Sequence, residues 1–561
     1  MEALDWLVIG VFFLALIGII VWVVRQKQND SADYFLGGRD ATWLAIGASI
    51  FASNIGSEHL IGLAGAGASS GMAMAHWEIQ GWMILILGWV FVPFYSRSMV
   101  YTMPEFLERR YNPQSRTILS VISLVSYVLT KVAVTVYAGG LVFQQVFGIK
   151  ELWGIDFFWI AAIGLVVLTA LYTIFGGMKS VLYTSVLQTP ILLLGSLIIL
   201  VLGFKELGGW DEMMRVCGAV TVNDYGDTMT NLIRSNDDAN FPWLGALIGS
   251  AIIGFWYWCT DQFIVQRVLS GKNEKEARRG TIFGAYLKLL PVFLFLIPGM
   301  IAFALHQKYI GAGGEGFLPM LANGTANADA AFPTLVAKLL PAGVKGLVVC
   351  GILAALMSSL ASLFNSSAML FTIDFYKRFR PETPEKKLVG IGQIATVVIV
   401  ILGILWIPIM RSVGDVLYTY LQDVQSVLAP GIAAAFLLGI CWKRTSAQGG
   451  MWGLIAGMII GLTRLGAKVY YSNAGEVADS TFKYLFYDMN WLFFCGWMFL
   501  FCIIVVIVVS LATEAPTAEK IQGLVFGTAT KEQKAATRAS WDHWDIIHTV
   551  IILAITGAFY W

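Results

Sequence analysis

The sequence predicts an all-α protein that crosses a membrane about fourteen times, and three observations lead to this fold class. Hydrophobic residues make up 57% of the 561 residues and charged residues only 13%, and the mean hydropathy is +0.72. Uncharged runs near the roughly 20 residues that a helix needs to cross a bilayer recur along the whole chain. Basic residues collect in alternate loops between these runs. Such a composition excludes a soluble globular domain.

The predicted spans follow one another through mostly short loops. The first run has no basic segment before it and no small-residue cleavage site after it, so we interpret it as a retained helix and not a signal peptide. The runs lie at roughly 4–24, 42–70, 76–98, 117–147, 153–175, 180–206, 242–267, 275–305, 342–374, 386–410, 415–440, 449–469, 489–512 and 543–560.

Positive charge in the short loops predicts which side of the membrane each loop faces. In the fourteen-span layout all of the basic short loops fall on one face, which should be cytoplasmic. Two long polar connections, near 207–241 and 306–341, hold few basic residues and fall on the opposite face, as do both termini. The residues concerned are Arg25, Lys27, Arg39, Arg97, Arg109, Arg110, Arg116, Lys272, Lys275, Arg278, Arg279, Lys377, Arg378, Arg380, Lys386, Lys387, Lys443 and Arg444.

Two spans carry polar residues near mid-membrane, and each opens a set of five spans. The segment 47–67 contains Asn54, Glu58 and His59 among many glycines and serines, and the later span contains Asp261. Irregular, polar backbone is tolerated at that depth where it lines an internal site, although small residues also suit a helix-packing seam. Five spans followed by five more are inverted in the bilayer, which places a central site between two broken helices. The predicted divisions are 1–40 for an extra helix and loop, 41–206 and 242–440 for the two repeats, 207–241 for an external loop, and 441–561 for three further helices.

Ionisable side chains inside the spans predict a polar binding site. A charge at the centre of a membrane helix costs about 2.5–3.5 kcal/mol on insertion scales, so such residues face inward and pair. Lys288 has no opposite charge nearby in sequence, and Glu78 is its expected partner. With His59 and Gln422, these side chains supply donors and acceptors for a neutral polyhydroxylated ligand. The structural alternative is an ion pair that only ties two spans together.

Aromatic residues accompany these polar groups. Trp77, Tyr257 and Trp258 offer flat apolar faces suited to the C–H face of a sugar ring. The alternative is that they anchor the helices at the membrane interface, where Trp and Tyr are enriched.

The segment 352–367, ILAALMSSLASLFNSS, places five serines in an apolar span. Such hydroxyls often bond the carbonyl one turn back or pack against a neighbouring helix. They also suit a sodium site, because sodium prefers oxygen ligands and an unwound stretch such as 52–55 frees carbonyls to complete the shell. From the residues alone both interpretations stand.

Other functional classes fit poorly. A formal net charge of +1 argues against a nucleic-acid partner. The six cysteines show neither a disulfide framework nor a metal spacing, and no nucleophile–base motif indicates an enzyme.

Five motifs resemble the sodium/solute symporter family, in particular its sodium/glucose cotransporter branch. In order they are DYFLGGRDATWLAIGASIFASNIGSEHLIGLAGAG, WYWCTDQFIVQR, YLKLLPVFLFLIPGM, AALMSSLASLFNSSAMLFTIDFY and AAFLLGICWKR, and they extend from about Asp33 to Arg444. The resemblance implies a leucine-transporter-like fold of five plus five helices, with one extra helix before it and three after it.

The resemblance also implies the roles of individual residues. The sugar contacts would be His59, Glu78, Lys288 and Gln422, with Tyr257 stacking on the sugar as an inner gate beside Trp258. Trp77 and Tyr418 would form the outer gate. The sodium ligands would be the carbonyls of Ala52, Ile55 and Ala355 and the hydroxyls of Ser358 and Ser359.

Three positions depart from the family pattern. Gly254 stands where relatives carry Thr or Asn that reaches the sugar, so one polar contact is expected to be lost. Ser185 replaces an Asp associated with a second sodium or with sodium exit, and Ala361 replaces a Thr tied to that second site. We therefore expect one sodium ion per solute.

The expected function is sodium-coupled symport of a neutral sugar, glucose or galactose, by a monomer in the plasma (inner) membrane with both termini outside. Myo-inositol, another family solute, or a sodium channel or sensor on the same fold are the alternatives.

Overall fold

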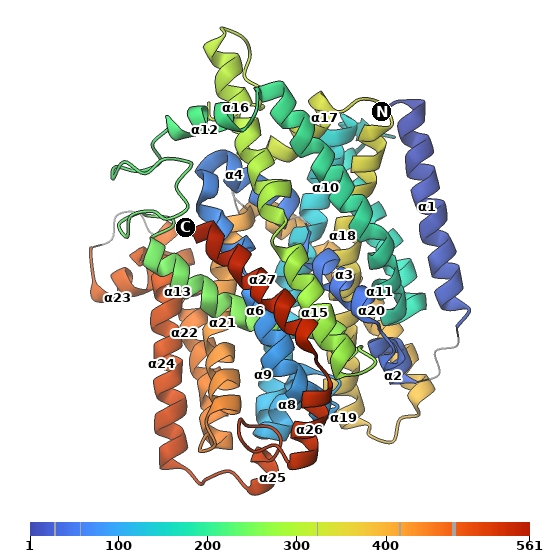
Figure 1. Ribbon diagram of the computed structural model, residues 1–561, viewed down its shortest axis with the longest axis vertical. Coiled ribbons are helices and arrows are strands. Elements are labelled where there is room, and N and C mark those ends of the chain that lie inside the picture. Colours follow the sequence, from blue (N-terminus) through green and yellow to red (C-terminus); the bar gives the residue numbers. More distant parts are fainter. Residues whose placement is uncertain (27–29, 57, 322–323, 414–416, 474–477, 561) are drawn as a thin grey trace.

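The first helix lies on the flank of a helical bundle. The computed structural model describes residues 1–26, 30–56, 58–321, 324–413, 417–473 and 478–560. Helix α1 (Ala3–Val24) packs on α11 and α18 and stands at the right-hand edge of Figure 1. Two short elements lead from it into the core: α2 (Ser31–Leu36) and η1 (Gly37–Arg39).

The second predicted span is a broken helix. Helix α3 (Trp43–Asn54) ends at Ile55, whose backbone is extended (φ −77°, ψ 104°). The chain resumes as the π-helix η2 (Glu58–Leu63) and continues as α4 (Ala64–Ser70). The break leaves carbonyls at the end of α3 without helical partners. Unwinding was predicted at 52–55, but residues 52–54 are helical and the break begins at Ile55.

The next elements run down one side of the bundle and return. Two π-helical turns, η4 and η5, interrupt them, and such turns are frequent at functional sites. The elements are η3 (Gly71–Met74), α5 (Ala75–Glu78), α6 (Gly81–Ile86), η4 (Leu87–Phe91), α7 (Val92–Ser98), α8 (Met103–Arg110), α9 (Pro113–Ser126), η5 (Tyr127–Val132) and α10 (Ala133–Phe147).

A short hairpin joins α10 to the longest helix. Strands β1 (Glu151–Leu152) and β2 (Ile155–Asp156) pair antiparallel, with Glu151 opposite Asp156. Helix α11 (Phe157–Leu207) follows and kinks at Gly177, whose φ of 52° suits glycine. The predicted spans 153–175 and 180–206 are the two halves of this kinked helix. Helix α12 (Trp210–Gly218) begins the long connection after it.

A second broken helix opens the second half of the chain. Helix α13 (Trp243–Gly254) runs into the π-helix η6 (Phe255–Thr260), and Asp261, which is extended, caps α14 (Gln262–Leu269). Then come α15 (Glu274–Lys288), η7 (Val292–Leu296) and α16 (Ile297–Gly311).

Helices α4 and α16 touch backbone to backbone. A Cβ atom on Gly67 would collide with the carbonyl of Leu296, and one on Gly299 with the carbonyl of Ala64. Only glycine permits this approach, so the backbones of the two helices lie directly against each other at these positions.

The remaining core helices surround the breaks. Helix α18 packs against α3 and α11 and is almost entirely buried. The elements are η8 (Ala328–Ala330), α17 (Ala331–Leu339), α18 (Val344–Met369), η9 (Leu370–Tyr376), α19 (Lys377–Phe379), α20 (Glu385–Val413) and α21 (Leu417–Cys441).

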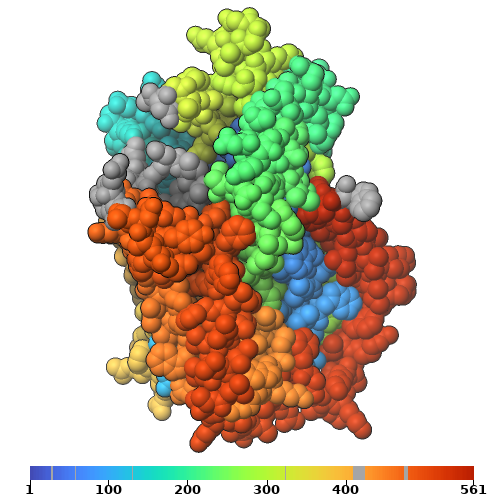
Figure 2. Space-filling model, turned by 90° about the vertical axis from the view of Figure 1, so that its left-hand side faces the viewer, coloured from blue at the N-terminus to red at the C-terminus, as the bar shows by residue number. Residues whose placement is uncertain are grey.

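The C-terminal helices cover one flank. Helices α22 and α24 pack on α21, and α27 runs diagonally over α6 and α15 (Figure 1). In Figure 2 a blue surface from the N-terminal part of the chain remains visible between the orange and red helices. The elements are α22 (Ala447–Asn473), α23 (Thr481–Lys483), η10 (Tyr484–Asp488), α24 (Trp491–Ala512), α25 (Ala518–Ile521), α26 (Lys531–Ala539) and α27 (His543–Tyr560).

The protein is a helical, multi-pass membrane protein. Eleven helices of the described chain are long and apolar enough to cross a bilayer, and one of them, Phe157–Leu207, contains the kink at Gly177. Two shorter apolar helices, Trp43–Asn54 and Ala133–Phe147, belong to interrupted segments. The count of fourteen spans and the repeat boundaries remain predictions.

The elements beside the basic loops share one end of the molecule. Helices α2, α8 and α19 lie toward the lower end in Figure 1, whereas α12 and α17, from the two long polar connections, lie toward the upper end. This arrangement is the one that the distribution of positive charge predicted.

Candidate functional site

A small polar cavity lies between the two helix breaks. Its volume is about 60 Å³, enough for no more than a few water molecules. Residues from η2, α5, η6 and α15 converge on it. Its lining consists of Asn54, Glu58, His59, Trp77, Glu78, Gln80, Ile253, Gly254, Tyr257, Trp258, Lys288 and Gln425.

An ion pair forms the centre of this cavity. The Nζ atom of Lys288 lies 2.6 Å from Oε2 of Glu78, and both side chains are buried. His59 Nε2 lies 3.3 Å from the same carboxylate oxygen, in contact but without the geometry of a hydrogen bond. The structure thus brings together His59, Glu78 and Lys288, and the predicted partner of Lys288 is the observed one.

A hydrogen-bonded chain leads from this pair to Tyr257. Lys288 donates to Oδ1 of Asn54 at 3.1 Å, and Nδ2 of Asn54 donates to the hydroxyl of Tyr257 at 3.2 Å. The Trp258 ring stands edge-on to Tyr257 at a centroid distance of 5.0 Å. Asn54, at the last position of α3, therefore ties the first helix break to the aromatic face of the second.

Lys131 supports Tyr257 from the other side. Its ammonium lies 4.7 Å from the centroid of the Tyr257 ring and 2.8 Å from Oδ2 of Asp261. Tyr127 donates to the other oxygen of Asp261. The π-turn η5 thus carries two groups that hold the break at Asp261, and the Lys131 charge is balanced by a buried carboxylate.

The upper side of the cavity is covered by aromatic rings. Trp77 is only 6% exposed, with its ring centroid 5.4 Å from that of Trp491 and 6.4 Å from that of Phe241. The side chains of its predicted gate partner Tyr418 and of the predicted sugar ligand Gln422 lie outside the described residues. Gln425, one turn further along α21, does line the cavity.

The space beside Gly254 is filled by Gln80. A Cβ atom at Gly254 would lie 2.6 Å from Oε1 of Gln80, and Nε2 of Gln80 donates to the carbonyl of Ser250 at 2.9 Å. The side-chain amide of Gln80 thus supplies a polar group where the sequence predicted the loss of one.

The predicted sodium ligands belong to the end of α3 and to α18, two helices that pack against each other. Ala52, Ile55, Ala355, Ser358 and Ser359 are all at most 2% exposed. A Cβ atom on Gly56, one residue past the end of α3 and its cap, would lie 3.1 Å from Oγ of Ser359. The Ser359 hydroxyl therefore borders the break.

Two serine contacts join α18 to its neighbouring helices. Oγ of Ser358 lies 3.2 Å from Oγ of Ser185, and Oγ of Ser53 lies 2.6 Å from Oγ of Ser362. These contacts show that hydroxyls of α18 meet both α3 and α11.

Glu58 places a carboxylate beside this cluster. Its Oε2 is buried and has no hydrogen-bond partner among the described residues. The same Cβ position on Gly56 that lies near Ser359 would lie 2.5 Å from this oxygen. An unpartnered carboxylate oxygen is the type of group that a hard cation attracts.

Four residues of the cavity and its surroundings were not predicted from the sequence in these roles. They are Asn54, which links Lys288 to Tyr257, together with Lys131, Gln80 and Gln425. Lys131 carried a usable signal, because it is a lone lysine in the apolar stretch YVLTKVAVTVYAGG and the rule applied to Lys288 applies to it equally. The neutral amides carried no comparable signal.

Comparisons with known proteins give a consistent family. The profile of the sodium:solute symporter family matches residues 34–457. Sodium/myo-inositol cotransporter 2 of Mus musculus is 37% identical over 542 residues, which cover 94% of this chain and 80% of that protein. Sodium/glucose cotransporter 4 of Danio rerio is 35% identical over 560 residues, covering 96% and 84%. The solved structure of a Na⁺-coupled sialic acid symporter in a substrate-bound outward-open state shares the fold, with a TM-score of 0.73 at 21% identity over 92% of this chain and 99% of that chain.

Proposed function

The chain belongs to the sodium:solute symporter family, with sodium as the coupled ion, and we propose that it imports a neutral hexose, glucose or galactose, by alternating access. The observation that carries this proposal is the buried group of His59, Glu78 and Lys288 beside Trp258. A hydroxyl both donates and accepts hydrogen bonds, and this group offers a carboxylate, an ammonium and an imidazole within one small cavity.

Recognition of the solute follows from the lining. The Glu78 carboxylate accepts from hydroxyls, while Lys288 donates to them. Gln80 and Gln422 are proposed to read further hydroxyls, and Tyr257 and Trp258 to cover the C–H face of the ring. The cavity has to widen for a hexose to enter, so entry is coupled to a rearrangement of its walls.

The proposed sodium site lies at the end of α3. Its ligands are the carbonyls of Ala52, Ile55 and Ala355 and the hydroxyls of Ser358 and Ser359. The buried oxygen of Glu58 adds negative charge beside this shell. Sodium bound there joins α3 to α18 and favours the form in which the outer path is open, and this differential stabilisation is the coupling.

Two gates are proposed on opposite sides of the solute. Trp77 and Tyr418 close the outer path, and Tyr257, held by Asn54 and resting against Lys131, closes the inner one. One charge that crosses 100 mV releases about 2.3 kcal/mol, which supports roughly fifty-fold accumulation before any chemical sodium gradient is added.

We propose that the protein has five-plus-five core helices and functions as a monomer. The basic loops would face the cytoplasm and both termini the outside of the plasma (inner) membrane. Residues 1–40 and 441–561 then lie outside the repeats.

Myo-inositol is the second candidate solute. It presents the same ring of hydroxyls, and sodium/myo-inositol cotransporter 2 of the mouse is among the similar proteins. A sodium channel or sensor on the same fold would show current or signalling without saturable uptake.

Uptake into proteoliposomes tests the proposal. Radiolabelled glucose and myo-inositol are supplied under an inward sodium gradient, with a matched potassium gradient as control. We expect saturable, sodium-dependent uptake of glucose, competed better by galactose than by myo-inositol. The reverse order of competition would assign the second candidate, and uptake of neither solute would overturn the proposed substrate class.

A further inference from the structure

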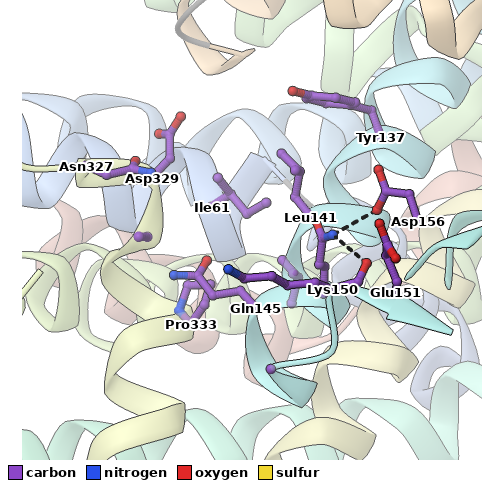
Figure 3. Close-up of a pocket in the computed structure, with 14 residues that line it drawn as sticks. Ile61, Tyr137, Leu141, Gln145, Lys150, Glu151, Asp156, Asn327, Asp329 and Pro333 are labelled. Atoms are coloured by element: carbon purple, nitrogen blue, oxygen red, sulfur yellow. Dashed lines mark hydrogen bonds between the residues drawn. The ribbon is translucent and has the colours of Figure 1, made fainter. Parts of the chain in front are cut away.

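A second, larger cavity opens at the end opposite the basic loops. Its volume is about 670 Å³, and its walls come from α10, the β1–β2 hairpin, η8 and α17. Figure 3 shows Asn327 and Asp329 on one side, Tyr137, Glu151 and Asp156 on the other, and Ile61 and Leu141 between them.

Besides the exposed carboxylate of Glu151, four hydrogen-bonding side chains in this cavity have no partner among the described residues. They are the amides of Gln145 and Asn327, the ammonium of Lys150 and the carboxylate of Asp329. Burial raises the pKa of the Asp329 carboxyl to about 6. The neighbouring Gln144, by contrast, donates to Asp156 at 2.8 Å and holds the hairpin. The four side chains are therefore available to a ligand, and at neutral pH Asp329 still bears its charge.

The chemistry of these groups selects hydroxyls. Lys150 donates, Asp329 accepts, and each amide does both, while Ile61, Leu141 and Pro333 form an apolar floor. The carboxylates of Asp329, Glu151 and Asp156 disfavour an anion, and the ammonium of Lys150 reduces the attraction that they exert on a cation. A neutral hydroxyl-rich molecule meets a complementary partner on every side.

The two cavities adjoin the same π-turn. His59 faces the inner cavity and Ile61 lines the outer one, and both belong to η2 (Glu58–Leu63). The outer cavity holds a hexose-sized molecule as it stands, whereas the inner one has to widen first.

We propose that this outer cavity is a second binding site for a neutral sugar or polyol, occupied without sodium before the solute reaches the inner site. The inference rests on the proposed function for the identity of the ligand. Because the outer site does not include the sodium ligands, its occupancy is independent of sodium.

Protection of an introduced cysteine tests the proposal on the purified full chain in detergent. Cys441, which is exposed, is replaced by Ser, and Gln145→Cys is labelled with a maleimide in potassium buffer. The probes are myo-inositol and D-glucose, with glycine betaine at equal osmolarity as a solute without hydroxyls. The matched control is Trp153→Cys, in the same hairpin region but 84% exposed and outside the cavity lining.

We expect the labelling rate at position 145 to fall about threefold when ligand is present at about twice its Kd, by mass action. The control at position 153 stays unchanged, and adding Asn327→Ala removes the protection. The double variant Glu78→Gln/Lys288→Met, which alters the inner site, keeps the protection. Gel filtration verifies that each variant is folded.

Three results would overturn the outer site: no protection in potassium, equal protection at positions 145 and 153, or protection that disappears in the inner-site double variant. The last result would instead assign the effect to closure of the inner site and leave the proposed function standing. Failure of the proposed function is seen separately, as the absence of sodium-dependent uptake by the native chain.

Discussion

The buried pair of Glu78 and Lys288 provides the sharpest test of the inner site, because a binding role and a purely structural role predict different results. The perturbation is a cycle of three variants: Glu78→Gln, Lys288→Met and the two combined. Both substitutions nearly conserve side-chain volume, and each single one leaves a buried charge without its partner at 2.6 Å.

The expected magnitudes follow from burial. Removing one member of a buried pair costs about 3–5 kcal/mol of unfolding free energy, whereas replacing both by neutral groups is often nearly neutral. We therefore expect each single variant to be destabilised by that amount and the double variant to recover most of it. Additive losses would instead give about twice the single value.

Solute binding separates the two roles. A hydrogen bond to a charged group contributes about 1.5–3 kcal/mol, so loss of one such contact weakens binding roughly 10- to 150-fold. If both side chains contact the solute, the double variant regains stability but does not regain binding.

The assays are equilibrium denaturation in micelles and binding of radiolabelled glucose and myo-inositol in sodium buffer. A double variant that binds solute as tightly as the native chain would refute the binding role and leave only an ion pair between two helices. A double variant that loses as much stability as the two single variants together would refute the pairing itself.

Three further variants probe other parts of the site. Gly254→Thr crowds Gln80, so we expect overpacking to cost about 1–3 kcal/mol of unfolding free energy; adding Gln80→Ala should recover most of that stability while removing the solute contact proposed for Gln80, and a single variant as stable as the native chain would contradict the geometry. Ser359→Ala should raise the sodium concentration needed for half-maximal uptake without changing the ratio of glucose to myo-inositol uptake, and a changed ratio would argue against a sodium role. Asn54→Ala removes the hydrogen bond to Tyr257, which contributes about 0.5–1.5 kcal/mol. We expect solute release to the inside, measured as efflux from preloaded proteoliposomes, to become roughly 2- to 10-fold faster. Unchanged efflux would rule out Tyr257 as the inner gate.

Family and fold class could be predicted because both rest on features that are local in sequence. Apolar runs of membrane length and the order of the motifs required no tertiary information, and the family was confirmed. The partner of Lys288 was also predicted correctly: a charge inside a span has to be paired, and Glu78 was the carboxylate expected to pair with it.

The neutral amides of the site could not be predicted because their contribution depends on which face of a helix turns inward. A neutral amide such as Asn54 or Gln80 carries no insertion penalty large enough to single it out. The meeting of Gln80 with Gly254 is a tertiary contact between α5–α6 and α13, and one sequence does not reveal it. The kink at Gly177, similarly, joins two predicted spans into one helix with a change of direction.

The contact between α4 and α16 has a mechanical consequence. At Gly67 and Gly299 the backbones lie against each other with no side chain between them, so any larger residue at either position would force the two helices apart. His59, which faces the inner cavity from the turn before α4, is therefore expected to move together with α4 and α16 as one unit. When this unit moves, the backbone has to bend at its ends, which are the break after Asn54 and the turn before η7. At these two places the close contact between α4 and α16 does not restrain the chain.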